Sequence, residues 1–491
     1  MKKGLCVVTG LLPLLLAACV QSAVPDTQLA QPTTPLPATR TAPLSTSTLA
    51  PSPTASPQPA AQRTQYTLAA GLDYAQHSLA VTESITYTNR SADALSELVL
   101  AVEPARQAGR FQLESVSLDG APAPQPYTLT GEKLTLPLSQ SLAPGGTVKV
   151  RLSFSIKLSS TPGVLSFDSA QGNLAGWYAR IPPYVSGQGW LLHEPGAVGE
   201  YQVYELADFD VTLSVSAAPA DLVVAASAPN DAVGGQYHYT LSAARTFTLS
   251  AGTDYVQLTA PAGSTRVTAY VFAGDEAAGE ASLAATVQAL QLYSRLFGVY
   301  TRPSLSVVEA DFADGMEYDG LYFLGKEYFK SYKGSPASYL VTLSAHETAH
   351  QWWFGGVGND QALEPWLDEA LATYSERLFY ENESPGQVDW WWQTRVQAYA
   401  PQGWVNSSIY AFSAFRPYVN AVYLRGAEFL EELRQGMGDT AFFAFLHGYY
   451  TAIQSQGQKD DLALATGSQF WNLLSQYTST DLSGLKSRYF K

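Results

Sequence analysis

The sequence predicts an α+β protein with two folded parts, a β-rich part followed by a mainly helical one. Residues 66–255 contain short alternating runs of apolar and polar residues that turn residues interrupt, a pattern typical of strands. After about residue 260 the apolar residues recur at helical spacing. A chain of 491 residues is also too long for one ordinary domain.

The first residues have the features of a bacterial export signal. Lys2 and Lys3 precede an apolar stretch, Leu5–Ala18, which is too short to span a bilayer as a helix. The stretch ends in Leu-Ala-Ala-Cys19, which resembles the bacterial lipobox, where the chain is cut before a cysteine that carries lipid. We therefore expect residues 1–19 to be a lipoprotein signal peptide and Cys19 to anchor the protein to the cell membrane, outside the cytoplasm. A plain signal peptide with an incidental cysteine is the alternative.

Residues 20–63 are dominated by Pro, Thr, Ser, Ala and Gln and carry almost no charge. Such a segment cannot bury enough apolar surface to fold, and its prolines keep it extended. It is predicted to be a disordered tether between the membrane and the folded part. Both cysteines of the chain lie within the first 19 residues, so the folded part has no disulfide bond.

The β-rich part is predicted to span residues 64–258 as an antiparallel sandwich or saddle. Its clearest strand patterns are Ser78–Tyr87, Leu98–Val102, Val148–Phe154 and Asp210–Val215. Three histidines of this part stand alone in the sequence and are not expected to bind metal. They are His77, His193 and His238.

The second part is predicted to span residues 259–491. Ala277–Phe297 has the pattern of a helix, Ser304–Ala310 that of a strand, Asp311–Gly320 that of a loop, and Tyr339–Phe354 that of a second long helix. Four shorter helices are expected near the end of the chain: Phe429–Gln435, Thr440–Gln454, Gly467–Tyr477 and Leu482–Phe490.

The strongest chemical signal in the chain is His346-Glu347-Thr-Ala-His350. Four residues along a helix rotate by about 400°, so the two histidines project from one face, one turn apart. Two imidazoles at that spacing can bind one Zn²⁺, and Glu347 is then placed as the general base that takes a proton from water. The alternative, a helix with two solvent-facing histidines, is disfavoured by the apolar residues around the motif.

A third zinc ligand is expected on the next helix, and Glu369 is the candidate. It follows His350 after 18 intervening residues, and Pro365 suits the first turn of its helix. The two segments, His346–Phe354 and Trp366–Ala372, resemble the HExxHQWFG and WLNEGFA motifs of the gluzincin aminopeptidases, the family of aminopeptidase N and leukotriene hydrolase. The resemblance implies a thermolysin-like catalytic domain.

The resemblance extends upstream to Asp314–Tyr318, which looks like the GAMEN or GGMEY motif of these exopeptidases. It implies that Glu317 receives the free α-amino group of the substrate and that Gly315 and Met316 belong to the substrate-binding segment. Asp314 replaces the first glycine of the family motif, and an extra carboxylate there is also compatible with tighter amine binding.

Downstream, Tyr423–Gly426 resembles the YxKG motif of the same family. It implies that Tyr423 donates a hydrogen bond to the oxyanion of the tetrahedral intermediate, a role suited to a phenol near zinc. Tyr418 falls where some relatives carry a tyrosine, but packing is the favoured role for it. Glu376 either supports a ligand histidine or is a solvated carboxylate on a helix face.

These patterns favour a zinc metallopeptidase that removes N-terminal residues from peptides or proteins with a free N-terminus. The formal net charge of −15 argues against binding of nucleic acid. Many relatives continue into a β module and a helical repeat domain that covers the active site, and this sequence stops short of both. An open-site endopeptidase or other hydrolase is therefore an alternative. A surface binding protein with an idle zinc site is another, although Glu347 and Tyr423 would then be unnecessary.

Overall fold

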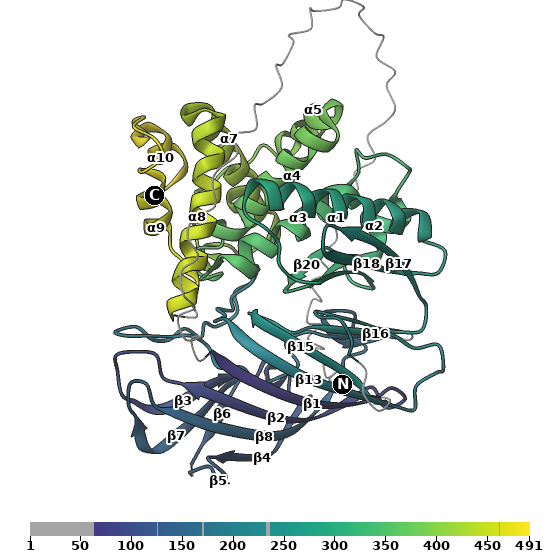
Figure 1. Ribbon diagram of the computed structural model, residues 1–491, viewed down its shortest axis with the longest axis vertical. Coiled ribbons are helices and arrows are strands. Elements are labelled where there is room, and N and C mark those ends of the chain that lie inside the picture. Colours follow the sequence, from purple (N-terminus) through teal and green to yellow (C-terminus); the bar gives the residue numbers. More distant parts are fainter. Residues whose placement is uncertain (1–62, 125, 169–170, 232–235, 461) are drawn as a thin grey trace, which may run out of the picture. The chain divides into compact units, whose positions relative to one another are not determined.

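The computed structural model describes residues 63–124, 126–168, 171–231, 236–460 and 462–491. The predicted signal peptide, Cys19 and nearly all of the predicted tether lie outside these residues. Ala61–Lys491 forms one compact unit, in which strands dominate the first half and helices the second (Figure 1). No helix in the described parts of the chain is both long enough and apolar enough to cross a membrane.

The main sheet of the first half has seven strands in the order β15-β13-β1-β2-β8-β4-β5. Their bounds are Thr64–Asp73 (β1), Ser78–Thr88 (β2), Phe111–Leu118 (β4), Ala121–Pro122 (β5), Thr147–Lys157 (β8), Ala207–Ser216 (β13) and Tyr237–Ala244 (β15). Residues of β1 and β8 alternate between buried and exposed, as the period of a half-buried strand requires. β1 and β13 pair in parallel, so the sheet is mixed rather than purely antiparallel.

Smaller sheets complete the first half. One has the order β3-β7-β6, a second β14-β16-β10-β9, and a third pairs β11 with β12. Their strands are Leu95–Ala101 (β3), Thr128–Thr130 (β6), Lys133–Leu142 (β7), Leu165–Phe167 (β9), Gln171–Leu174 (β10), Tyr184–Val185 (β11), Gly189–Trp190 (β12), Val223–Ala226 (β14) and Leu249–Gly252 (β16). Leu100 and Leu134 of the three-stranded sheet share one apolar core with Val81 and Val150 of the main sheet, as in a sandwich.

The second half begins with a five-stranded sheet in the order β17-β18-β19-β21-β20. Its strands are Tyr255–Ala262 (β17), Thr265–Phe272 (β18), Ser304–Ala310 (β19), Gly315–Tyr318 (β20) and Leu321–Gly325 (β21). The predicted boundary after residue 258 falls inside β17. β20 forms within the segment predicted as a loop and lies at the edge of the sheet, so one side of its backbone is unpaired in the ladder.

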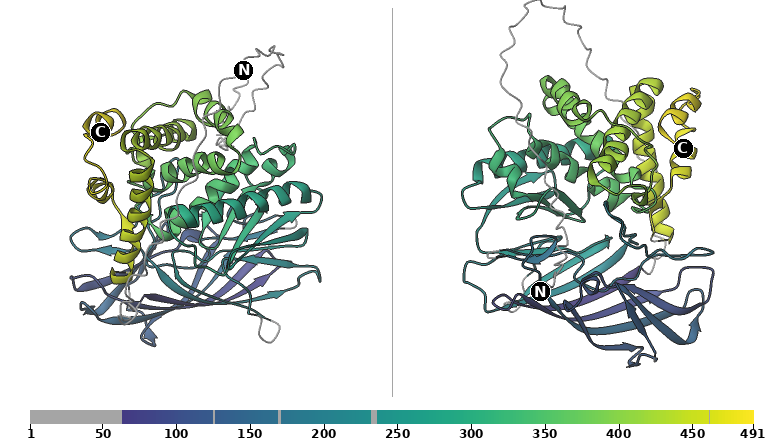
Figure 2. Two further views of the ribbon diagram at one scale, coloured as in Figure 1. Left: turned by 45° about the horizontal axis from the view of Figure 1, so that its top comes forward. Right: turned by 180° about the vertical axis from the view of Figure 1, so that it is seen from behind.

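The helices of the second half carry the predicted site. They are Glu276–Leu296 (α1), Lys326–Ser331 (α2), Tyr339–Ala349 (α3), Trp366–Glu383 (α4), Val388–Trp391 (α5), Phe415–Val419 (α6), Arg425–Met437 (α7), Asp439–Asp460 (α8), Gly467–Leu474 (α9) and Ser483–Tyr489 (α10). α1 packs on β17 and β18, α3 on α1 and α4, and α4 on α7. Figure 2 shows the yellow-green helices α7 and α8 side by side from two directions.

Short helical turns and bridges connect these elements. The turns are Glu103–Arg106 (η1), Gln351–Gly356 (η2), Pro385–Gln387 (η3), Trp392–Val396 (η4), Gln397–Tyr399 (η5), Ile409–Ala411 (η6) and Asn420–Leu424 (η7). Two short strands, Gly358–Asn359 (β22) and Leu464–Ala465 (β23), pair with each other in parallel.

The predicted helix Tyr339–Phe354 is shorter than expected. The α-helix ends at Ala349, and a wider π-type turn, η2, follows it, in which Trp353 and Phe354 leave helical geometry. Gly355 N–H donates to His350 O at 2.9 Å, which closes this wider turn. Apolar periodicity does not distinguish a helix from a wide turn that continues its buried face, so the sequence could not show this end.

Arg245, which follows β15, ties the first half of the chain to this turn. Its Nε–H donates to Phe354 O at 2.7 Å, and its backbone N–H donates to Asp319 Oδ2 at 2.7 Å. Asp319 is buried and also pairs with Arg302. The segment after the histidine motif is therefore held from both halves of the chain.

Candidate metal centre and active site

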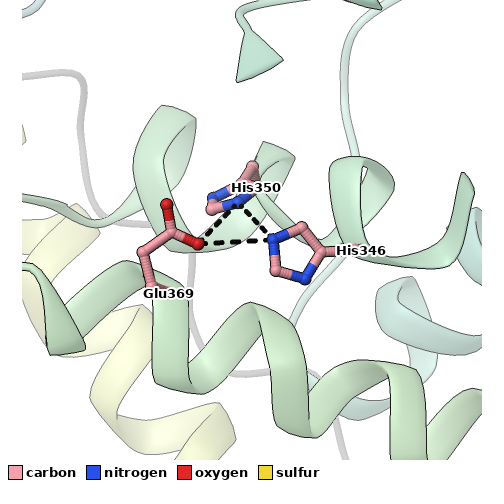
Figure 3. A group of neighbouring side chains, drawn as sticks. All are labelled: His346, His350 and Glu369. Atoms are coloured by element: carbon pink, nitrogen blue, oxygen red, sulfur yellow. Dashed lines mark hydrogen bonds and ion pairs between the residues drawn. The ribbon is translucent and has the colours of Figure 1, made fainter. Parts of the chain in front are cut away.

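Three side chains from two helices converge on one point. His346 and His350 project from the end of α3, and Glu369 projects from the first turn of α4 (Figure 3). The two Nε2 atoms are 3.1 Å apart, and Glu369 Oε2 lies 3.3 Å from Nε2 of His346 and 3.6 Å from Nε2 of His350. Tetrahedral zinc with bonds of about 2.0–2.1 Å separates its ligand atoms by about 3.4 Å. The three donors therefore have the spacing of a zinc site.

The hydrogen bonds of the Nδ1 atoms of His346 and His350 show that both rings turn Nε2 toward the point where the three side chains meet. His346 Nδ1 lies 2.8 Å from Glu376 Oε1, and His350 Nδ1 lies 3.0 Å from Trp353 O. A carboxylate and a carbonyl only accept hydrogen bonds, so each Nδ1 carries a hydrogen and each neutral ring turns the lone pair of Nε2 inward. A cation bound between the two inward lone pairs and the carboxylate oxygen would stabilise this arrangement.

The electrostatics of the site also favour a positive charge at this point. Burial lowers the pKa of His346, but its hydrogen bonds with Glu369 and Glu376 outweigh burial and raise the pKa to about 9. Burial raises the pKa of Glu369, but the two neighbouring histidines lower it by more, so that the pKa lies below its ordinary value. Glu369 Oε2 is buried, and its nearest polar neighbours are the Nε2 atoms of the two histidines. The donor set therefore fits a bound metal ion.

Glu347 lies beside the metal ligands and close to β20. Atoms of Glu317, Glu347 and His350 lie within 4.8 Å of one another. Burial raises the pKa of the Glu347 carboxyl to about 8, and the nearby histidines oppose this. Its Oε2 is buried without a partner among the described residues, while a Cβ at Gly315 would overlap its Oε1. Position 315 must therefore be glycine for Glu347 to lie where it does.

β20 carries the predicted substrate-binding residues Gly315, Met316 and Glu317. Met316 packs against a small apolar cluster, and Glu317 is buried at 6% exposure. Glu317 Oε1 accepts a hydrogen bond from Gln361 Nε2 at 3.3 Å. The same nitrogen donates to Asp368 Oδ2 at 3.2 Å, so one amide holds two buried carboxylates.

Asp314 adopts a left-handed backbone conformation, with φ of 74°. Glycine tolerates this region best, which explains a glycine at this point of the family motif, and aspartate is one of the other residues that accept it. The Asp314 side chain accepts hydrogen bonds from Tyr328 OH and Gly315 N–H, both at 3.2 Å. Its Oδ1 is therefore held by the loop itself.

Tyr423 lies on η7 with its ring parallel to that of His346, at 6.1 Å between centroids. Burial, followed by the charge of Glu369, raises the pKa of its hydroxyl well above the ordinary value, so the phenol keeps its proton. Tyr418 is fully buried and packs edge-on against Tyr423 at 5.5 Å.

Glu376 is fully buried, so the solvated alternative for this residue does not hold. Its Oε1 accepts from His346 Nδ1–H and from Arg395 Nη2–H. Its Oε2 accepts from Trp391 Nε1–H and from Arg395 Nε–H. Trp391, Arg395 and Gln361 were missed in the sequence, because no motif or periodicity marks the segments that contain them.

None of the three isolated histidines of the first half lies in the metal-binding group. His193 pairs with Asp360 at 2.8 Å, and His238 pairs with Asp210 at 3.0 Å. His77 stacks on Phe167 at 4.0 Å between ring centroids.

Comparison with known proteins shows which protein family the second half of the chain resembles. Residues 281–489 match the family described as the peptidase family M1 domain. This part of the chain is similar to an M1 peptidase domain. A stretch of 236 residues, 44% of this chain, is 28% identical to aminopeptidase M1-A of rice, Oryza sativa subsp. japonica. The chain covers only 26% of the length of that rice protein.

Solved structures extend the similarity to nearly the whole described fold. The M1 zinc metallopeptidase of Deinococcus radiodurans superimposes with a TM-score of 0.59 at 20% identity, over 87% of this chain and 93% of its own. A mutant of that enzyme bound to a Tyr-Ser-Ala substrate gives 0.58 at 20% identity, over 88% of this chain and 95% of its own. The predicted resemblance and fold class are thus confirmed. The predicted Zn²⁺ cofactor agrees with the description of these M1 proteins.

Proposed function

We propose that this protein is a zinc-dependent aminopeptidase that hydrolyses the N-terminal peptide bond of peptides or proteins with a free N-terminus. The observation that carries the proposal is the position of buried Glu347 between the three convergent ligands and the edge strand that holds Glu317. A zinc ion at this centre supplies Lewis acidity, which polarises a carbonyl group and acidifies water.

The side chains of the site divide the proton chemistry between them. Glu347 takes the proton from the attacking water and passes it to the leaving amine. Burial raises the pKa of Glu347, and the positive charge of a zinc ion held by the three ligands would lower it again, which favours the ionised form that accepts a proton. The Tyr423 hydroxyl, which keeps its proton, donates a hydrogen bond to the developing oxyanion.

Glu317 sets the position of the substrate by pairing with its α-ammonium group. The unpaired edge of β20 offers backbone donors and acceptors to an extended peptide, which then lies along the strand as a further strand would. The Tyr-Ser-Ala complex of the Deinococcus radiodurans protein supports a peptide as the class of substrate.

The decisive experiment compares two substrates on the purified full-length chain after its zinc content has been measured. One is a chromogenic amino-acid anilide with a free amine, and the other is its N-acetylated form. We expect one zinc per chain and much faster turnover of the free amine than of the acetylated form. Faster turnover of the acetylated form would point to an endopeptidase, and bound zinc without turnover of either would point to a binding protein.

We further propose that Cys19 carries lipid and holds the enzyme on the outer side of a cell membrane. This proposal is supported by the lipobox alone. Cells grown with a labelled fatty acid should incorporate the label into the wild-type chain but not into Cys19→Ser. Incorporation into both chains would refute the assignment.

A further inference from the structure

Glu376 is the most completely hydrogen-bonded carboxylate around the metal centre. It is fully buried, and each of its oxygens accepts two hydrogen bonds. Three of the four donors come from two residues, Trp391 and Arg395, at distances of 2.8 to 3.0 Å. The fourth donor is His346, whose other ring nitrogen faces the centre.

The two donor residues belong to one short segment. Trp391 ends α5 and Arg395 lies on η4, the π-type turn that follows it. Trp391 is fully buried and the Arg395 side chain is 11% exposed. The chemistry proposed above uses neither residue, yet both side chains donate to the same carboxylate.

We propose that Arg395 and Trp391 are positioning residues of the metal centre, which act through Glu376 to fix the ring of His346 for zinc. The inference rests on the proposed zinc site. A carboxylate that accepts four bonds in fixed directions cannot rotate, so the ring that donates to it is fixed in tautomer and in orientation. The guanidinium group matches both oxygens in a planar fork, which a lysine ammonium does not do.

A purely structural ion pair is the competing explanation, and the chain offers a matched control for it. Arg434 is also nearly buried, with 8% of its side chain exposed, and its guanidinium holds both oxygens of Glu381. Within the described part of the chain, no hydrogen bond or ion pair links Arg434 or Glu381 to a metal ligand. Arg434→Met should therefore lower stability as Arg395→Met does, without changing the affinity for zinc.

The test measures zinc affinity, by competition with a chelator, on full-length Arg395→Met, Arg395→Lys, Trp391→Phe and Arg434→Met. Thermal unfolding of each metal-free variant is recorded beside it. Loss of such an outer partner typically weakens metal binding about 10- to 100-fold, and we expect Arg395→Met in this range. Arg395→Lys should fall between Arg395→Met and the wild type. Trp391→Phe removes one neutral donor, and about fivefold is expected.

A double-mutant cycle separates action through Glu376 from an independent effect. If Arg395 acts through this carboxylate, Glu376→Gln combined with Arg395→Met should weaken zinc binding no more than Glu376→Gln alone. Additive losses would overturn the proposal. The absorption spectrum of the Co²⁺-substituted protein should change in Arg395→Met and remain unchanged in Arg434→Met.

The outcomes distinguish this inference from the proposed function. If the wild-type chain binds no zinc, the proposed function fails together with the inference. If the wild type binds zinc and both Arg395→Met and Trp391→Phe bind it equally well, only the inference fails. If Arg395→Met does not fold, the zinc affinity of Trp391→Phe tests the inference instead. This variant keeps an aromatic side chain at position 391 and the ion pair between Arg395 and Glu376.

Discussion

Glu347 lies so close to Gly315 that no side chain fits between the edge strand and the predicted general base. A Cβ at position 315 would overlap the Glu347 carboxylate. Gly315→Ala must therefore displace either Glu347 or β20. Misplacement of a reacting group by about 1 Å can cost about 100-fold in rate, and we expect a loss of kcat of that order. Zinc content should stay at the wild-type level, because the substitution removes none of the three ligands. A variant with normal kcat would show that the site accommodates a methyl group at position 315.

Glu347→Gln removes the proton acceptor and keeps nearly the same volume. General-base catalysis contributes about 100- to 10,000-fold, so turnover should fall by at least that lower figure. The three ligands remain, and zinc binding should persist. Zinc content and kcat measured on the same preparation test both parts, and near-normal turnover would exclude Glu347 as the base.

Glu317→Ala tests amine recognition separately from catalysis. The variant loses the carboxylate that pairs with the α-ammonium group, so KM for free-amine substrates should rise at least about tenfold, the effect of losing one charged hydrogen bond. Residual hydrolysis of N-acetylated peptides should not change. Equal losses on both classes of substrate would show that Glu317 supports the fold of the site instead.

Gln361→Leu tests the amide that joins Glu317 to Asp368. Without this donor the two buried carboxylates face each other uncompensated, and Glu317 should no longer hold a fixed orientation. We expect KM for free-amine substrates to rise by about five- to tenfold and kcat to change less. Leu363→Ala, an exposed position in the same loop, is the control and should leave both constants unchanged. An unchanged KM in Gln361→Leu would show that contacts other than the one with Gln361 fix the orientation of Glu317.

The sequence predicted the parts of the site that depend on local spacing. Helical geometry alone brings His346 and His350 together, and the helix that carries Glu369 was expected from its pattern. The sequence could not predict contacts between segments that no periodicity relates. The four bonds on Glu376 are made across 15 to 30 residues, and Gln361 meets Glu317 across 44.

β20 was predicted as part of a loop because four residues are too few to show a strand period. The parallel pairing of β1 with β13 likewise joins residues that lie more than 140 positions apart, and no local signal marks such a partner. The predicted strands Ser78–Tyr87 and Asp210–Val215, in contrast, lie within β2 and β13, because their alternation is local.

A last prediction concerns stability against pH, and it depends on a group distant from the metal centre. Glu309 on β19 is fully buried, and its Oε1 has no hydrogen-bond partner among the described residues. Burial raises the pKa of this carboxyl from 4.5 to about 8, although the Phe272 N–H that donates to its Oε2 lowers it somewhat. The folded protein therefore binds one proton more than the unfolded chain between these two pH values.

This contribution to stability is complete below pH 4.5 and is lost as the pH rises to about 8. Its slope is at most about 1.4 kcal/mol per pH unit. Glu309→Gln should remove the slope, so the variant should gain stability over the wild type as the pH rises from 5 to 8. Urea unfolding at several pH values and at one fixed zinc concentration measures the difference. Glu327→Gln, whose carboxylate is 75% exposed, should keep the wild-type slope, and an equal slope in Glu309→Gln would mean that Glu309 is ionised in the fold.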